Sequence, residues 1–320
     1  MLRRTGLAAE ALYEHQEQAM HARGAALLVA PTGSGKTEAA LLWAARQARA
    51  RLFYALPYQA SMNAMYDRLR AIFGEEATGL LHGRSTLALY QRFMDQDYTP
   101  REATRLARWL HNLSALPFHP VKVFSPYQML KATYQLKGYE AMLTDYAQAA
   151  FVFDEIHAYE PRRLALILET VRYLREHLGA QFLVMAATMP YPVRERLADA
   201  LPEVQNIRAS ESLYRAFARH RVHLLEGSLL AEKVLDQVLH AFQEGLLVLV
   251  VCNTVGHAQE VYQALRDRVP SARRQDVFLL HGRFHGLDRQ RKERHIQYVA
   301  ELGSRARRPV LLVATQVVEV

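Results

Sequence analysis

Six short apolar runs, separated by stretches with helical spacing, constrain the fold of the first 200 residues more than any other feature. The runs are Ala26–Ala30, Leu52–Leu56, Thr78–His82, Val121–Ser125, Phe151–Asp154 and Phe182–Ala186. Each run is continuously apolar rather than alternating, which is typical of strands that helices cover on both faces. The order of strand and helix patterns therefore predicts an α/β fold with a mainly parallel sheet.

The pentapeptide Leu-Leu-His-Gly-Arg occurs twice, at Leu80–Arg84 and at Leu279–Arg283. A strand, a turn and a helix pattern precede each copy, and a further apolar run behind a proline follows it. In the second block the helix pattern begins at Ala231–Glu244, and a strand pattern covers Leu246–Cys252. Identical residues in matching positions of two such blocks indicate two related α/β domains.

The domain boundaries follow from composition. A proline, mixed polarity and clustered basic residues predict a linker over residues 206–222, between a first domain (1–205) and a second (223–320). The chain ends on the apolar pattern RPVLLVATQVVEV, without a polar tail or a covering helix. Such a strand would leave apolar surface uncovered, so we expect the second domain to be truncated.

Composition excludes some classes of protein. The 320 residues contain no apolar run near the roughly 20 residues that span a bilayer, and the N-terminus lacks a signal-peptide pattern, so we expect no membrane partner. One cysteine, Cys252, cannot form an internal disulfide, which indicates a reducing cytoplasm. The net charge of +8 suits a polyphosphate partner, but solvated basic helices explain it equally well.

The segment ALLVAPTGSGKTEAA predicts a phosphate-binding loop between a strand and a helix. Its glycines let backbone N–H groups approach phosphate oxygens, and the following helix N-terminus adds partial positive charge. We expect Lys36 to reach the β- and γ-phosphates of ATP and Thr37 to ligate Mg²⁺. The predicted nucleotide-binding residues are Pro31, Thr32, Gly33, Ser34, Gly35, Lys36 and Thr37. The structural alternative is a Gly/Ser turn with an incidental lysine.

An acidic pair follows the buried run Ala149–Phe153, at the strand end where α/β sheets bind ligands. We assign Asp154 to Mg²⁺, partly through water, and Glu155 to the attacking water, with His157 facing the same cleft. An ordinary helix N-cap is the alternative. Thr188, at the end of the predicted strand in FLVMAATMP, is placed to contact the pair through a hydrogen bond, although a plain strand end explains it as well.

These motifs occur in an order that resembles superfamily 2 DExH helicases. The segments are GSGKT, ALPYQASMNAMYDRL, FSPYQML, DEIHAYEP, AATMP, VVCNTVGHAQEVYQAL, LLHGRFHGLDRQRKE and VATQVVEV. More narrowly, DEIHAY and the NAM and NTV segments resemble the helicase part of the CRISPR-associated type I interference helicase-nuclease. The resemblance runs from about His15 onward and implies two RecA-like domains.

The resemblance also implies roles for individual residues. Gln16 would contact adenine, unless it is simply an exposed helical glutamine. Nucleic-acid contacts are implied for Pro57, Gln59, Ser125, Gln128, Asn253, Thr254, Arg283, Thr315 and Gln316. His281 and His285 are more simply packing residues than metal ligands, because no third ligand accompanies them.

The implied function is ATP-dependent single-strand DNA translocation or unwinding, directed at foreign DNA in antiviral defence. Partners would be single-stranded DNA, a CRISPR effector complex and a separate nuclease subunit or domain, since the chain contains no His-Asp dipeptide. Two departures are Ala186, where the family has serine, and the arginine-finger motif, which would follow Val320. The alternatives are a nucleotide- and nucleic-acid-binding fragment without turnover, and another DExH helicase acting on RNA or DNA.

Overall fold

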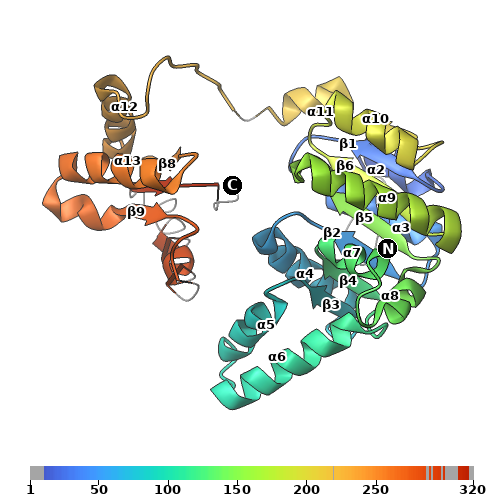
Figure 1. Ribbon diagram of the computed structural model, residues 1–320. Helices are drawn as coiled ribbons and strands as arrows, with labels where there is room; N and C mark the ends of the chain where they lie inside the picture. The colour runs from blue at the N-terminus through green and yellow to red at the C-terminus, as the bar shows by residue number, and fades with distance from the viewer. Residues whose placement is uncertain are drawn as a thin grey trace. The chain divides into compact units, whose positions relative to one another are not determined.

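The computed structural model describes residues 11–218, 220–285, 288–289, 291–296, 298–299 and 309–316 (Figure 1). The chain divides into two compact units, residues 1–220 and 221–320. Residues 317–320, the end of the predicted terminal strand pattern, lie outside the described residues. No helix in the described ranges is long and apolar enough to cross a membrane.

The first unit contains a seven-stranded sheet of order β3-β4-β2-β5-β6-β1-β7. Its strands are β1 Ala26–Val29, β2 Leu52–Ala55, β3 Thr78–Leu81, β4 Val121–Phe124, β5 Ala150–Asp154, β6 Gln181–Ala186 and β7 Gln205–Arg208. Every neighbouring pair is parallel, which confirms the predicted parallel α/β fold. Parallel pairing also brings the carboxyl ends of all seven strands to one edge of the sheet.

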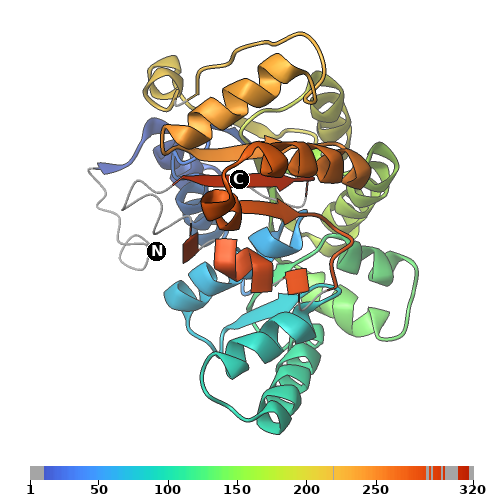
Figure 2. The same cartoon turned by 90° about the vertical axis from the view of Figure 1, so that its left-hand side faces the viewer.

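Helices cover both faces of this sheet (Figures 1 and 2). They are α2 Glu14–His21, α3 Lys36–Gln47, α4 Gln59–Phe73, α5 Ser85–Met94, α6 Pro100–Ala115, α7 Tyr127–Thr133, α8 Tyr139–Tyr146, η2 Ile156–Ala158, α9 Pro161–Leu178, α10 Tyr191–Ala200 and α11 Glu211–Ala216. Tyr54 packs with Trp43 of α3 and Met62 of α4 on one face, while the adjacent Phe53 packs with Ile167 of α9 on the other. Because successive strand side chains point to opposite faces, burial on both faces requires uninterrupted apolar runs.

The predicted linker is wrong in its first part, because that part forms strand β7 and helix α11 of the first unit. Residues 206–222 were expected to connect the domains, but Asn206–Arg208 pair with Leu27–Val29 of β1, and α11 follows in the same unit. Ile207 is the one buried residue of this edge strand. A strand that buries a single side chain produces no apolar run, so its sequence reads as a connection.

The second unit contains a parallel three-stranded sheet of order β8-β10-β9. Its described elements are α12 Glu232–Gln243, β8 Leu247–Val251, α13 Val255–Arg268, η3 Ser271–Asp276, β9 Val277–Leu280 and β10 Val310–Ala314. Leu239 and Phe242 of α12 and Val261 of α13 pack with Val313 of β10 in one core. Leu247, Leu249 and Val251 of β8 remain exposed.

The two Leu-Leu-His-Gly-Arg segments occupy equivalent positions. Each leaves the carboxyl end of an edge strand, β3 or β9, in its own sheet. The imidazole Nδ1 accepts the backbone N–H of the following arginine in both copies, at 3.1 Å from His82 to Arg84 and 3.3 Å from His281 to Arg283. The residue after the neighbouring strand, Ser125 or Thr315, donates its backbone N–H to the carbonyl of the last leucine at 3.2 Å in both units. The predicted structural repeat is therefore confirmed.

A buried ion cluster lies at the opposite, amino-terminal edge of the first sheet. Lys122 of β4 and Asp145 of α8 are almost fully buried, and their charged atoms are 2.5 Å apart. Arg51 Nε lies 2.9 Å from the second carboxylate oxygen of Asp145 and also donates to the Pro117 carbonyl. A lysine inside an apolar strand is accommodated because the carboxylate compensates its desolvation.

Removal of the Asp145 carboxylate should destabilise the first unit strongly. Asp145→Ala leaves the Lys122 ammonium buried without a counter-charge, which costs about 3–5 kcal/mol. The measurement is urea unfolding followed by tryptophan emission, because both tryptophans of the chain, Trp43 and Trp109, lie in this unit. The double variant Lys122→Met/Asp145→Leu should unfold closer to the wild type. Equal midpoints for Asp145→Ala and the wild type would contradict this account.

His82 should make the first unit less stable in mild acid. Burial, and then the nearby His111, lower the pKa of His82 from 6.5 to about 4. Its two nitrogens bond the Arg84 N–H and the Asn63 side-chain oxygen, as a neutral imidazole requires. Since the unfolded chain binds the proton more readily, stability is complete above pH 6.5 and is lost as the pH falls toward 4, by up to roughly 3 kcal/mol.

The check is the free energy of unfolding measured between pH 7 and pH 5. A His82→Gln variant should be less stable than the wild type at pH 7 and should lose less stability on acidification. The exposed His21, changed to Gln, is the control and should keep the wild-type slope. An unchanged slope in His82→Gln would show that another group carries the pH dependence.

Candidate active site

The predicted phosphate loop connects β1 to α3 and contains two left-handed residues. Gly33 has φ +83° and Gly35, the N-cap of α3, has φ +80°. Glycine adopts this region without strain, so the loop turns tightly just before the helix. The Ser34 hydroxyl is buried and donates to the Pro31 carbonyl at 2.8 Å, which fixes the turn. The backbone is thus shaped for close approach by an anion at a helix N-terminus.

Lys36 points back into this loop. Its ammonium donates to the Ala30 carbonyl at 3.1 Å, and its side chain is 10% exposed. Burial lowers the pKa of Lys36, an effect that the nearby Glu155 and Asp154 carboxylates oppose. A partly desolvated cation held by weak carbonyl partners has capacity for a stronger, anionic one.

The acidic pair lies at the carboxyl end of β5, at the same edge of the sheet, with Asp154 as the last residue of the strand. Glu155 Oε1 lies 4.0 Å from the Lys36 ammonium, so the loop and the pair line one cavity. Glu155 has a left-handed backbone with φ +50°, which turns the chain away directly after the strand. Burial, and then the adjacent Glu155, raise the pKa of Asp154 to about 6.

Asp154 has one satisfied and one unsatisfied oxygen. Tyr54 of β2 donates its hydroxyl to Oδ2 at 3.2 Å, whereas Oδ1 is buried with no hydrogen-bond partner within the described ranges. A buried carboxylate oxygen without a donor is costly unless a cation binds it. Mg²⁺ is usually held by one or two carboxylates together with phosphate and water oxygens, so Asp154 and the Thr37 hydroxyl fit this ion. Within the described part of the chain, no group of three or more Asp, Glu, His or Cys side chains is arranged to hold a metal ion by itself.

Gln16 belongs to the same site through α2. Its amide nitrogen donates to the Gly35 carbonyl at 3.1 Å, and its oxygen accepts the Tyr13 N–H at 3.0 Å. The side chain is 3% exposed, so the alternative of an exposed helical glutamine is wrong. A side chain at Gly35 would collide with the Gln16 amide. The cavity that Gln16, Gly35, Lys36 and the acidic pair line has a volume of about 590 Å³, within the range of ligand sites.

His157 and Thr188 differ in their relation to the acidic pair. His157 Nδ1 lies 3.4 Å from Glu155 Oε2, but His157 is not among the residues that line the cavity, so its place in the site stays a prediction. Thr188 instead lines another cavity with Arg194 and Arg208. Within the residues that the structure describes, Thr188 forms no hydrogen bond with either carboxylate. The predicted contact is therefore absent here, and a coupling role for Thr188 stays a prediction.

The residues with implied nucleic-acid contacts follow neighbouring strands. In the first unit, Pro57 and Gln59 follow β2, and Ser125 and Gln128 follow the adjacent β4. Gln59 is exposed, whereas Gln128 is 8% exposed and its buried side-chain oxygen has no partner in the described ranges. Strand pairing brings the four residues to one edge.

In the second unit the corresponding residues follow three adjacent strands. They are Asn253 and Thr254 after β8, Arg283 after β9, and Thr315 and Gln316 after β10. Asn253, Arg283 and Gln316 are exposed, but Thr315 is 8% exposed. The Thr254 hydroxyl caps α13 by accepting the His257 N–H at 3.2 Å, which gives it a structural role.

Sequence reasoning missed Tyr54 and Arg68. Tyr54 lies inside the apolar run of β2, and nothing local shows that its hydroxyl reaches Asp154. Arg68 of α4 donates to the Thr37 hydroxyl at 3.1 Å and pairs with Glu38. Its position on a helix 31 residues from Thr37 carried no motif signal.

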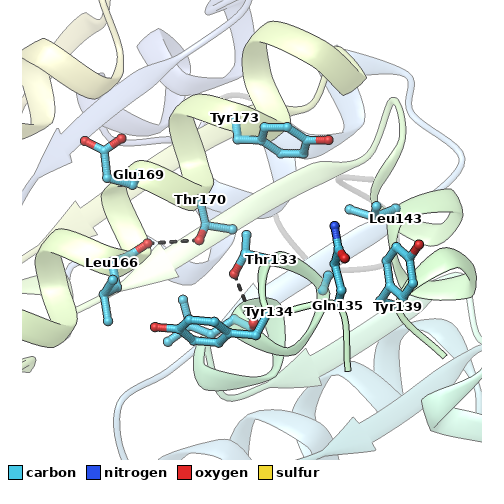
Figure 3. A pocket seen from close by; sticks show the side chains of 11 residues that line it. Thr133, Tyr134, Gln135, Tyr139, Leu143, Leu166, Glu169, Thr170 and Tyr173 are labelled. Atoms are coloured by element: carbon cyan, nitrogen blue, oxygen red, sulfur yellow. Dashed lines mark hydrogen bonds between the residues drawn. The ribbon is translucent and has the colours of Figure 1, made fainter. Parts of the chain in front are cut away.

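A second cavity, of about 370 Å³, lies between α7, α8 and α9 (Figure 3). Tyr134, Leu166 and Tyr173 line it, and none of the predicted site residues does. The hydroxyls of Thr133 and Thr170 donate to carbonyls within their own helices. The chemically reactive groups thus gather in the first cavity, at the strand ends.

Two family profiles match the sequence. The profile of the DEAD/DEAH box helicases matches residues 13–197, and that of the C-terminal part of the CRISPR-associated nuclease/helicase Cas3 matches residues 244–320. A Cas3 homologue of Methanocaldococcus jannaschii is 29% identical over 302 residues, which cover 92% of this chain and 40% of the homologue. The chain spans 34–40% of the length of the first two curated relatives.

Solved structures agree on the fold. The crystal structure of T. fusca Cas3-ATP superimposes with a TM-score of 0.70 and 23% identity, over 99% of this chain and 41% of that one. The DUF1998 helicase MrfA bound to DNA gives a TM-score of 0.63 and 16% identity, over 96% of this chain and 42% of that one. Together with the profile match over more than half of its length, these findings show that the chain belongs to the DEAD/DEAH box helicase family and carries a Cas3-like C-terminal helicase region.

Proposed function

We propose that the chain is the ATP-driven motor region of a single-strand DNA translocase that acts in CRISPR type I interference. The observation that carries this proposal is the 4.0 Å approach of the Lys36 ammonium to the Glu155 carboxylate in one cavity. The relatives named as CRISPR-associated nuclease/helicases support the pathway. Foreign DNA as the substrate, and an effector complex and a separate nuclease subunit or domain as partners, are further parts of this proposal.

In this proposal the phosphate loop binds the phosphates of ATP, and the acidic pair binds the metal ion and activates water. When bound, Mg²⁺-ATP supplies the phosphoanhydride bond that is cleaved and the metal charge that stabilises the transition state. Lys36 would provide fixed positive charge at the phosphates, while Thr37 and Asp154 would hold the metal. Tyr54 orients Asp154 by donating to Oδ2, and Oδ1 has no hydrogen-bond partner within the described ranges.

Glu155 is the proposed general base. It is about a third exposed, so water reaches it, and its two oxygens face Lys36 and His157. A carboxylate within hydrogen-bond reach of a water molecule can orient it and accept its proton. Gln16 donates to the Gly35 carbonyl, so it would link the binding of adenine to the conformation of the phosphate loop.

The strand-end residues of each unit are proposed to contact DNA. Gln59, Arg283 and Asn253 are exposed at carboxyl strand ends, where side chains and backbone groups can bind phosphates. MrfA, a structural neighbour, was solved bound to DNA. Thr188, near the end of β6, is proposed to couple ATP hydrolysis to movement along DNA. The proposed cellular location of the protein is the cytoplasm.

Two substitutions should separate binding from turnover. Lys36→Ala should abolish ATP binding, because the loop then lacks its cation. Glu155→Gln should keep ATP binding but lower the turnover rate by about 10²–10⁴-fold, because only the general base is lost. The measurements are binding of a fluorescent ATP analogue and multiple-turnover phosphate release by this chain. Glu169→Gln, which changes an exposed carboxylate on α9, is the matched control.

Wild-type ATP binding without turnover would refute the motor and favour a nucleotide-binding module. Turnover in Glu155→Gln equal to that of the wild type would refute the assigned base.

Single-stranded DNA should stimulate ATP hydrolysis, since a translocase couples the two ligands. The measurement is phosphate release with and without oligo-dT, compared with oligo-U at equal nucleotide concentration. Stimulation by oligo-U alone would favour an RNA helicase. If neither oligonucleotide changes the rate, translocation is the wrong assignment.

A further inference from the structure

The outer face of α6 combines arginines with an exposed tryptophan. Arg101, Arg105, Arg108 and Trp109 are all exposed, and Trp109 is 56% exposed. At about 100° per residue, these four side chains lie within about 100° of the helix circumference. The opposite side buries Ala103, Ala107 and Ser114 against the unit. We call these four residues the α6 basic–aromatic face.

The arginines of this face have no ion pairs in the described part of the chain. The nearest acid on the helix, Glu102, accepts the Thr99 N–H at 3.1 Å and the Thr99 hydroxyl at 2.6 Å. These bonds, and to a smaller degree Arg105, lower the pKa of Glu102. The positive charge of the face is therefore largely uncompensated.

Helix α9 shows that this arrangement is not general in the molecule. Three of its arginines, Arg163, Arg172 and Arg175, pair with Glu160, Glu169 and Glu176. Exposed arginines on a helix commonly find such partners at short sequence separation. A helix that presents three arginines without them is suited to an external anion.

Trp109 adds a flat apolar surface beside the charges. The other tryptophan, Trp43, is fully buried and donates its indole N–H to the Gly24 carbonyl at 3.0 Å. Bases of a single strand stack on exposed aromatic rings, whereas bases inside a duplex are covered by their neighbours. The ring thus favours a single-stranded partner over a double-stranded one.

The helix that carries the face is anchored at its start and in its second half. Thr99 and Glu102 form a capping box at the start of α6, with Pro100 at the first position. At the other end, His111 Nδ1 lies 2.7 Å from the Ser85 hydroxyl, which donates to the carbonyl of His82 or to this nitrogen. The helix is therefore tied to the segment that leaves β3 at its carboxyl end.

We propose that the α6 basic–aromatic face binds single-stranded DNA, with phosphates on the arginines and a base stacked on Trp109. Arg101 to Arg108 span about 10 Å of the helix axis. A stacked strand carries roughly three phosphates over that length, at about 3.4 Å each. This inference deepens the proposed function and rests on it for the choice of DNA as the strand.

Trp109 provides a local reporter, because the only other tryptophan is buried. Titration with unlabelled oligo-dT should quench Trp109 emission, and Trp109→Phe should remove the quenching while retaining most of the affinity. In a parallel titration with labelled oligo-dT followed by anisotropy, Trp109→Ala should weaken binding about 10-fold. The triple variant Arg101→Gln/Arg105→Gln/Arg108→Gln should lower the slope of log affinity against log salt by about 2.

The matched control is Arg163→Gln/Arg172→Gln/Arg175→Gln on α9, which removes the same charge and should keep wild-type affinity and salt slope. Emission of Trp43 in Trp109→Phe, and far-UV circular dichroism of each variant, verify folding. Tight oligo-dT binding without Trp109 quenching would overturn the proposal, as would equal losses in the two triple variants.

Two further outcomes separate this proposal from its alternatives. Quenching of Trp109 by poly-glutamate, with the same dependence on the three arginines, would overturn it in favour of an acidic protein partner. Trp109 quenching by oligo-dT in a chain without ATP turnover would support the DNA-binding face while refuting the motor.

Discussion

The carboxyl ends of the seven parallel strands meet at one edge, and the candidate active site depends on this arrangement. The phosphate loop follows β1 and the acidic pair follows β5, with β6 between them in the sheet. Residues far apart in sequence therefore face one cavity, where the Lys36 ammonium and the Glu155 carboxylate are 4.0 Å apart. An antiparallel β5 would place its acidic pair at the opposite edge, out of reach of the loop.

Local backbone geometry then sets the positions of the reactive atoms. Left-handed residues stand at both strand exits, Gly33 and Gly35 in the loop and Glu155 after β5. A non-glycine residue in this region costs free energy, which the surrounding structure must supply. At Glu155 the consequence is that its carboxylate faces Lys36 and His157, while Asp154 remains buried with Tyr54.

The repeated Leu-Leu-His-Gly-Arg segments show how one turn serves two sheets. In both units a buried imidazole accepts the backbone N–H two residues on, so the chain makes the same hydrogen-bonded turn after each strand. Burial lowers the pKa of both histidines, which keeps the accepting nitrogen unprotonated near neutral pH. In the first unit the same turn also anchors α6 through Ser85 and His111.

The sequence alone determined six strands of the first sheet, the parallel α/β class, the phosphate loop and the acidic pair. Each of these is a local pattern of apolar runs, glycines or adjacent charges. It did not reveal β7, whose single buried residue makes no pattern, and it placed a linker there. Only the tertiary structure decided which distant side chains meet, such as Tyr54 with Asp154, Arg68 with Thr37 and Gln16 with Gly35. These contacts depend on strand order and helix packing. The residues that meet are far apart in the sequence, and no periodic pattern relates them.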